Sequence, residues 1–66
     1  MRLEVDKESD TLYFRLDESK VVESEEVRPG VILDFDEKGR VIGVEFLHIK
    51  TLISEQELSS LKFQAG

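Results

Sequence analysis

Hydrophobic and polar residues alternate along much of the first two thirds of the chain. Alternation with a period of two is typical of strands that bury one face. Turn-forming residues separate the alternating stretches, among them the pair Pro29–Gly30, and Gly39. The pattern predicts five strands, at about 2–6, 11–16, 20–27, 31–36 and 41–47. Because short turns join them, we expect an antiparallel meander.

The predicted strands can be paired by matching their hydrophobic sides. With 7–10 as the first loop, Val5 lies opposite Leu12 and Leu3 lies opposite Phe14, so both hydrophobic sets share one face. The last two strands are expected to pair in the same way, through the couples Leu33–Ile42 and Val31–Val44. The face that results should form the main core.

After the last predicted strand the period of the hydrophobic pattern changes. Ser54 is followed three residues later by Glu57, which is the spacing of a capping box at a helix N-terminus. Leu58 and Leu61 then lie on one side of the helix. We therefore predict a short C-terminal helix at about 55–62. It must dock its hydrophobic side on the sheet, because so short a helix is not stable alone in water.

Size and composition indicate a single domain, 1–66, of the α+β class with mainly β structure. A chain of 66 residues buries only about 60% of the surface that its unfolded form exposes, so little stability is left over. The chain has no cysteine and one histidine, which excludes disulfides, thiolate metal sites and a multi-histidine site within one chain. Oligomerisation is the remaining means of stabilising so small a domain.

The charge of the chain narrows the choice of partners. It carries 15 acidic and 9 basic residues, a net charge of −6. This charge repels phosphate backbones and anionic membranes, so we expect neither nucleic acid nor a membrane as partner. No hydrophobic run approaches the roughly 20 residues of a membrane helix, and the first residues lack a signal-peptide core, which favours a cytoplasmic location. A basic protein is the partner that the charge favours, although solubility alone also explains it.

Three stretches of the sequence resemble one known family. They are 1–16, 25–36 and 39–45. The first contains a strand, an acidic turn and the pattern "aspartate, small or polar, leucine, tyrosine" from Asp10 to Tyr13. Together they resemble the signature segments of the bacterial and archaeal family called domain of unknown function 2283, over residues 1–47. The resemblance implies a small stand-alone protein without an established function, sometimes encoded beside toxin-like proteins.

One acidic stretch matches part of a calcium-binding pattern. The residues from Asp34 to Glu45 fit positions 1, 3, 6 and 12 of the EF-hand loop. Lys38, however, puts a cation where a ligand oxygen is needed, and Pro29–Gly30 interrupts the helix that should precede the loop. A hairpin with Gly39 in its turn explains the stretch better. We therefore predict no metal site and no cofactor.

Two other acidic groups have simpler interpretations. The carboxylates of the first turn are explained by solvation and belong to Asp6, Glu8 and Asp10. A strip of glutamates crowds the third predicted strand, at Glu23, Glu25 and Glu26. Charge on an edge strand discourages unwanted pairing. The alternative is an acidic recognition strip for a basic partner.

The sequence gives little support for catalysis. His48 is the only histidine, and no serine sits in a nucleophile elbow. We therefore expect no catalytic residue and no enzyme. An enzyme would need a pocket shared between subunits, formed by residues such as Asp34, Asp36, Glu45 or His48.

Several hydrophobic residues fall on the face opposite the predicted core. They are Val21, Val27, Ile32, Val41 and Leu47. A sheet that exposes so much hydrophobic surface on its second face is unusual for a monomer. We expect a second subunit to cover this partner-facing surface, the alternative being that segment 48–53 folds back over it.

Three hypotheses for function follow from these patterns. The favoured one is a non-catalytic protein–protein interaction module that acts as a homodimer. The second is an antitoxin-like acidic partner of a basic nuclease-type toxin. The third, and least favoured, is an enzyme with a site shared between subunits.

Overall fold

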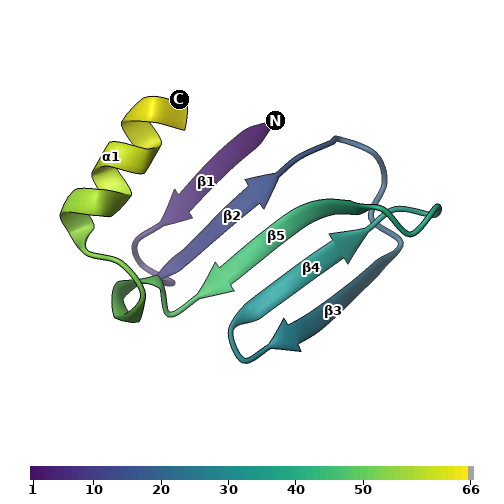
Figure 1. Cartoon of the computed structure of the whole chain (residues 1–66), viewed down its shortest axis with the longest axis horizontal. Helices are drawn as coiled ribbons and strands as arrows, with labels where there is room; N and C mark the ends of the chain where they lie inside the picture. The colour runs from purple at the N-terminus through teal and green to yellow at the C-terminus, as the bar shows by residue number, and fades with distance from the viewer. Residues whose placement is uncertain (66) are drawn as a thin grey trace.

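The computed structural model describes residues 1–65, with the backbone but not the side chains of 62–65. The elements are β1 (Arg2–Asp6), β2 (Thr11–Arg15), β3 (Glu23–Arg28), β4 (Val31–Phe35), β5 (Val41–Leu47), the 3₁₀ turn η1 (Ile49–Thr51) and α1 (Glu55–Ala65) (Figure 1). All paired strands are antiparallel. The predicted class, a five-stranded antiparallel sheet with a C-terminal helix, is confirmed. The helix extends to Ala65 instead of ending near 62, and β3 begins at Glu23 instead of near 20.

The strand order is β1-β2-β5-β4-β3, which differs from the sequential order of a meander. Strands β3, β4 and β5 follow one another as hairpins, while β2 lies beside β5, which is Greek-key order. The connection 16–22 therefore crosses one end of the sheet to reach β3, as Figure 1 shows. The physical reason lies in composition. All six residues of β3 are exposed and three are glutamates, so β3 belongs at an edge, whereas the hydrophobic β5 takes the centre.

The two predicted hairpins have different outcomes in register. The β1–β2 register is confirmed, with Val5 opposite Leu12 and Leu3 opposite Phe14. In the β4–β5 hairpin the predicted couples are wrong, and the observed ones are Leu33–Val44 and Val31–Phe46. The ladder is irregular between Asp34 and Phe35. Phe35 pairs with Val41 across the loop 36–40, whereas a loop of even length was predicted. A slip of two residues keeps the paired side chains of 31–34 and 43–46 on their predicted faces, whereas Val41, beyond the irregular position, changes side.

The β4–β5 turn is built around the carboxylate of Asp36. Its Oδ1 accepts hydrogen bonds from the amides of Lys38 and Arg40, both at 2.9 Å, and its Oδ2 accepts one from Arg40 Nε at 2.8 Å. Gly39 adopts a φ of 78°, the left-handed conformation that the sequence predicted for it. The hydrogen bond from the Arg40 amide is the main reason why the pKa of Asp36 lies below 3.8, although desolvation opposes it.

The hydrophobic core lies between α1 and one face of the sheet, near β1 and β2. Its buried members are Leu12, Ile49 and Leu58, and the residues packed around them are Leu3, Val5, Phe46, Ile53 and Leu61. The Ser54 Oγ accepts a hydrogen bond from the Glu57 amide at 3.1 Å, as the capping pattern predicted. Segment 48–53 joins this core through Ile49 and Ile53. It therefore does not cover the opposite face, and that alternative is wrong.

Acid should destabilise the fold in part through Asp36. Because the pKa of Asp36 is lower in the folded chain than in the unfolded one, its contribution is complete above the unfolded value and is lost as the pH falls through the folded value. We expect Asp36→Asn to lower the melting temperature by several degrees at pH 7, and this difference should shrink toward pH 3. Circular dichroism melts at both values test this expectation. Glu37→Gln, which removes an exposed charge from the same turn, is the control.

Candidate functional site

The two faces of the sheet have different chemistry. Residues that lie directly opposite one another on paired strands project from the same side. We call the side of the core the hydrophobic face, and its main residues are Leu12, Phe14, Val31, Leu33, Phe35, Val44 and Phe46. The other side is the polar face, with Arg2, Glu4, Tyr13, Arg15, Ser24, Asp34 and Glu45.

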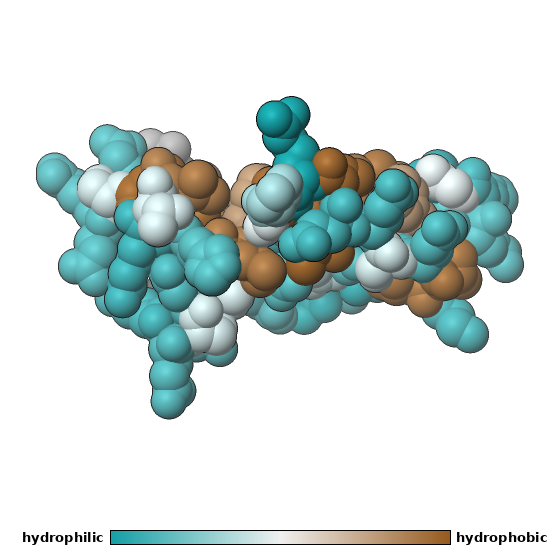
Figure 2. All heavy atoms as spheres, turned by 90° about the horizontal axis from the view of Figure 1, so that it is seen from below, coloured by the Kyte–Doolittle hydropathy of each residue, from teal (hydrophilic) through white to brown (hydrophobic). Residues whose placement is uncertain are grey.

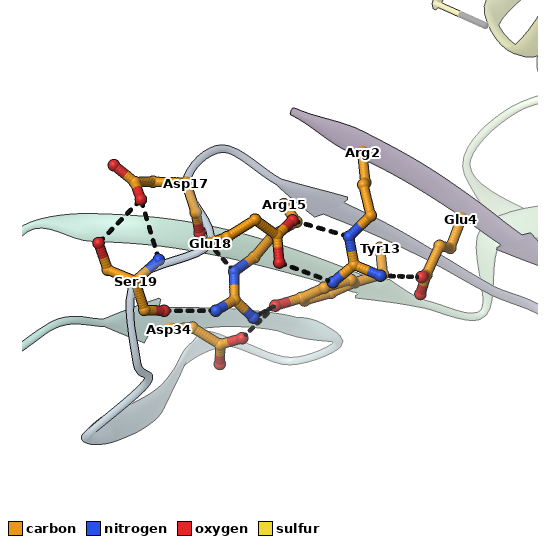
Figure 3. Close-up of polar contacts among 8 residues, drawn as sticks. All are labelled: Arg2, Glu4, Tyr13, Arg15, Asp17, Glu18, Ser19 and Asp34. Carbon is orange, nitrogen blue, oxygen red and sulfur yellow. Dashed lines mark hydrogen bonds and ion pairs between the residues drawn. The ribbon is translucent and has the colours of Figure 1, made fainter.

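A hydrogen-bonded network crosses the polar face from β2 to β3. Tyr13 Oη donates to Asp34 Oδ2 at 2.7 Å and accepts from Arg15 Nη1 at 3.1 Å (Figure 3). Ser24 Oγ donates to the other oxygen of Asp34 at 2.6 Å. Burial and the bond to Asp34 raise the pKa of Tyr13, while Arg15 opposes the shift. Neutral Tyr13 is therefore the state that the network favours.

Gly43 allows this network to exist. Tyr13 lies on β2 and Asp34 on β4, so their hydrogen bond passes over the intervening strand β5 at Gly43. A Cβ atom at Gly43 would lie only 2.6 Å from Tyr13 Oη and 3.0 Å from Asp34 Oδ2. Any larger residue would therefore displace the tyrosine ring from the sheet.

The same network holds the connection between β2 and β3. Arg15 Nε donates to the carbonyl oxygen of Asp17 at 2.6 Å, and Arg2 Nε donates to Glu18 Oε2 at 2.8 Å (Figure 3). Asp17 Oδ1 in turn accepts from the amide of Ser19 at 2.9 Å. Within residues 1–61, every buried side-chain polar atom has a hydrogen-bond partner. A network satisfied in this way stabilises the fold.

The residues that an enzyme or a metal site would need are dispersed. Asp34 and Glu45 lie on the polar face, and Asp34 is engaged by Tyr13 and Ser24. Asp36 is enclosed in the turn before β5, whereas His48 follows β5 at its other end, about 20 Å away along an extended strand. In the part of the chain that the structure describes, no three acidic or histidine side chains are grouped to hold a metal ion.

The acidic residues of the first turn have separate structural roles. Asp6 Oδ1 accepts from the amides of Glu8 and Ser9 at 3.0 and 3.2 Å, and these bonds lower the pKa of Asp6. Asp10, with a φ of 59°, accepts at its Oδ1 from the amide of Lys50 at 3.1 Å. The first carboxylate thus forms the turn, and the other ties the β1–β2 hairpin to η1.

The five residues predicted to face a partner do not form one surface. Ile32 and Leu47 lie on the polar face, whereas Val41 lies opposite Phe35 on the hydrophobic face. Val21 precedes β3, and Val27 lies at an irregularity of β3 between Glu26 and Arg28. The reason is that the two irregular positions change which side a residue faces, which an unbroken alternation cannot anticipate.

The predicted acidic strip is divided between the two faces. Glu23 lies opposite Phe35 and Glu25 opposite Leu33, so both project from the hydrophobic face at its β3 edge. Glu26 lies opposite Ile32 on the polar face, and its carboxylate accepts from the amide of Gly30 at 3.2 Å. Only Glu23 and Glu25 therefore share a surface.

α1 covers the hydrophobic face only near β1, and the part of that face on β4 and β5 stays open. The sequence analysis did not predict this open part. In Figure 1, α1 lies beside β1, away from β4 and β3. Consistent with this, Phe14, Val31, Leu33, Phe35 and Val44 are only half-buried. A hydrophobic groove of about 390 Å³ runs between α1 and the sheet, lined by Leu12, Phe14, Phe46, Ile49, Leu52, Ile53 and Leu61. Figure 2 shows hydrophobic side chains at the surface at the helix end and along the sheet. The signal was available, because one short helix cannot cover five strands.

These features define a small antiparallel β-sheet protein with Greek-key strand order, one flanking helix, a satisfied polar face and a partly open hydrophobic face. The chain belongs to the family described as Protein of unknown function (DUF2283), whose sequence model matches residues 2–50. The resemblance noted from the sequence is thereby confirmed. No curated protein and no solved structure matches the chain. Within the described residues, no helix has the length and hydrophobicity to cross a membrane.

Replacing Gly43 should test the packing of the polar network. We expect Gly43→Ala to lower the free energy of unfolding by about 1–3 kcal/mol, because the added methyl group overlaps the Tyr13 ring. Urea denaturation measures this loss. In a Tyr13→Ala background the same change should cost clearly less, since the overlapping ring is gone. An equal cost in both backgrounds would contradict the contact.

Proposed function

We propose that this protein is a non-catalytic protein–protein interaction module that acts as a homodimer through the open part of its hydrophobic face. The supporting observation is that the chain exposes more solvent-accessible surface than a compact monomer of its mass. The chain exposes 4889 Å², whereas a compact monomer of 7.6 kDa exposes about 4,300 Å². The difference of about 600 Å² approaches the roughly 800 Å² that each partner buries in a standard interface.

The shape of the molecule supports the same proposal. Its radius of gyration is 12.3 Å, compared with about 11 Å for a compact domain of this length. Its extents are 36 × 26 × 16 Å, so the molecule is a flat plate. Stable domains consist of at least two packed layers. Here α1 supplies a second layer only at the β1 side of the sheet, and a second copy would supply it for β4 and β5.

The polar face supports a non-catalytic role. Tyr13, Arg15 and Asp34 bind one another or the backbone, which leaves none of them free to act as a base or nucleophile. Polar groups engaged in this way stabilise the sheet. The hydrophobic face is then the surface through which a partner would bind.

Paired substitutions at adjacent positions test the homodimer. Leu33 faces the open hydrophobic side and Ile32 faces the polar side, and both are half-buried. We expect the parent protein to have twice the mass of one 7.6 kDa chain in light scattering at micromolar concentration. Leu33→Lys should yield a folded monomer, because a charge cannot be buried unpaired in the interface. Ile32→Lys, the matched control, should remain a dimer.

Two results would contradict the proposal. A parent protein that is monomeric at micromolar concentration would exclude the homodimer. A dimer that persists in Leu33→Lys but dissociates in Ile32→Lys would place the interface on the polar face. Circular dichroism of both variants separates loss of association from loss of folding.

The antitoxin-like role is the second candidate, and the position of Glu23 and Glu25 favours it. Both carboxylates are exposed at the β3 edge of the hydrophobic face, where they could engage a basic protein. Co-purification from the native host should then recover a basic partner. Glu23→Lys combined with Glu25→Lys should abolish its recovery, whereas Glu26→Lys on the other face should not. Recovery that is unaffected by the double change would argue against this role.

A further inference from the structure

We propose that the two copies stack face to face about a two-fold axis that runs along the strands, so that α1 of each copy lies beside β3 of the other. This inference rests on the homodimer proposed above. It deepens that proposal by specifying which elements of the second copy meet which elements of the first. Three features carry it: the position of α1, the thickness of the layers, and the glutamates of β3.

The layers have matching thickness. α1 packs on the hydrophobic face through Leu58 and Leu61, on the side of β1 and β2. A helix with its side chains is about 10–12 Å across, and stacked sheets lie about 10 Å apart. A partner sheet can therefore occupy the same layer as α1, next to it, and cover β5, β4 and their half-buried residues Leu33 and Val44.

The position of α1 selects the direction of the axis. A two-fold axis along the strands exchanges the two edges of the sheet, so the partner's helix comes to the β3 side, where no helix of the first copy stands. An axis across the strands leaves the edges in place and sets α1 against α1. Two stacked helices would hold the sheets about 20 Å apart, which is too far for their hydrophobic faces to touch. Only the first arrangement closes the open face.

The charge pattern selects the same axis. Glu23 and Glu25 project from the hydrophobic face on β3, opposite Phe35 and Leu33. An axis across the strands would stack β3 on β3 and bring these carboxylates against their own copies, which is unfavourable for like charges. An axis along the strands keeps the two β3 strands apart, so that these carboxylates do not meet their own copies.

Cross-linking of introduced cysteines tests the arrangement, because the chain has no cysteine of its own. Glu25→Cys marks β3. Ser60→Cys marks an exposed position of α1 next to Leu61, which lines the groove. Ser59→Cys is the matched control, since Ser59 lines the hollow on the β1 side of the helix with Val5 and Lys7. Chains with different single cysteines are mixed, allowed to exchange subunits and treated with a short bis-maleimide.

We expect the Glu25–Ser60 product to exceed the Glu25–Ser59 product several-fold in mass spectrometry. It should also exceed the Glu25–Glu25 and Ser60–Ser60 products. Predominance of those self-products, or a dimer that gives no Glu25–Ser60 product, would overturn the axis along the strands. Light scattering of the same samples separates the two proposals, because a monomer would refute the homodimer itself.

Discussion

The hydrogen bond from Tyr13 to Asp34 joins two strands that are not neighbours, because β5 lies between them. This contact requires the strand order β2-β5-β4 and a residue without a side chain at the crossing, which Gly43 provides. It also brings Arg15 to the connection 16–22, which must cross the end of the sheet once β5 occupies the centre. The tyrosine that lies across the middle strand therefore links the strand order, the position of the glycine and the path of the connection.

The polar contacts on one face leave the other face to supply the hydrophobic stabilisation. In the described residues that face contributes few deeply buried side chains, with Leu12, Ile49 and Leu58 forming the cluster under α1. One short helix covers only part of the hydrophobic face of the single sheet. Because ordering each residue costs about 1.5 kcal/mol, a domain of this size needs additional burial, and it has no disulfide to replace it. The association that we propose through the open face would supply that burial without changing the fold.

Local patterns in the sequence predicted the local features of the fold. The β1–β2 register follows from matched alternation across a short loop, and the start of α1 follows from Ser54 and Glu57. The strand order could not be read in this way, because it depends on contacts between residues as far apart as Tyr13 and Asp34. The residues of the predicted partner surface lie on different faces for a related reason. The irregular position between Asp34 and Phe35 places Val41 on the same side as Phe35, whereas unbroken alternation assigned it to the other.

The positions of the glutamates on β3 give the acidity of the chain a specific role at the edge of the sheet. A β3 edge free of charge would offer an unpaired row of backbone groups to another sheet, and the flat plate could then extend edge to edge. Glu23, Glu25 and Glu26 oppose that outcome, since like charges would meet along such a junction. The other edge, β1, is flanked by α1 (Figure 1). Because glutamates oppose pairing at the β3 edge and α1 flanks the β1 edge, the hydrophobic face is the surface on which binding of a second copy would bury the most hydrophobic area. The face-to-face stacking that we propose would yield a closed pair, whereas edge pairing would yield an open-ended assembly.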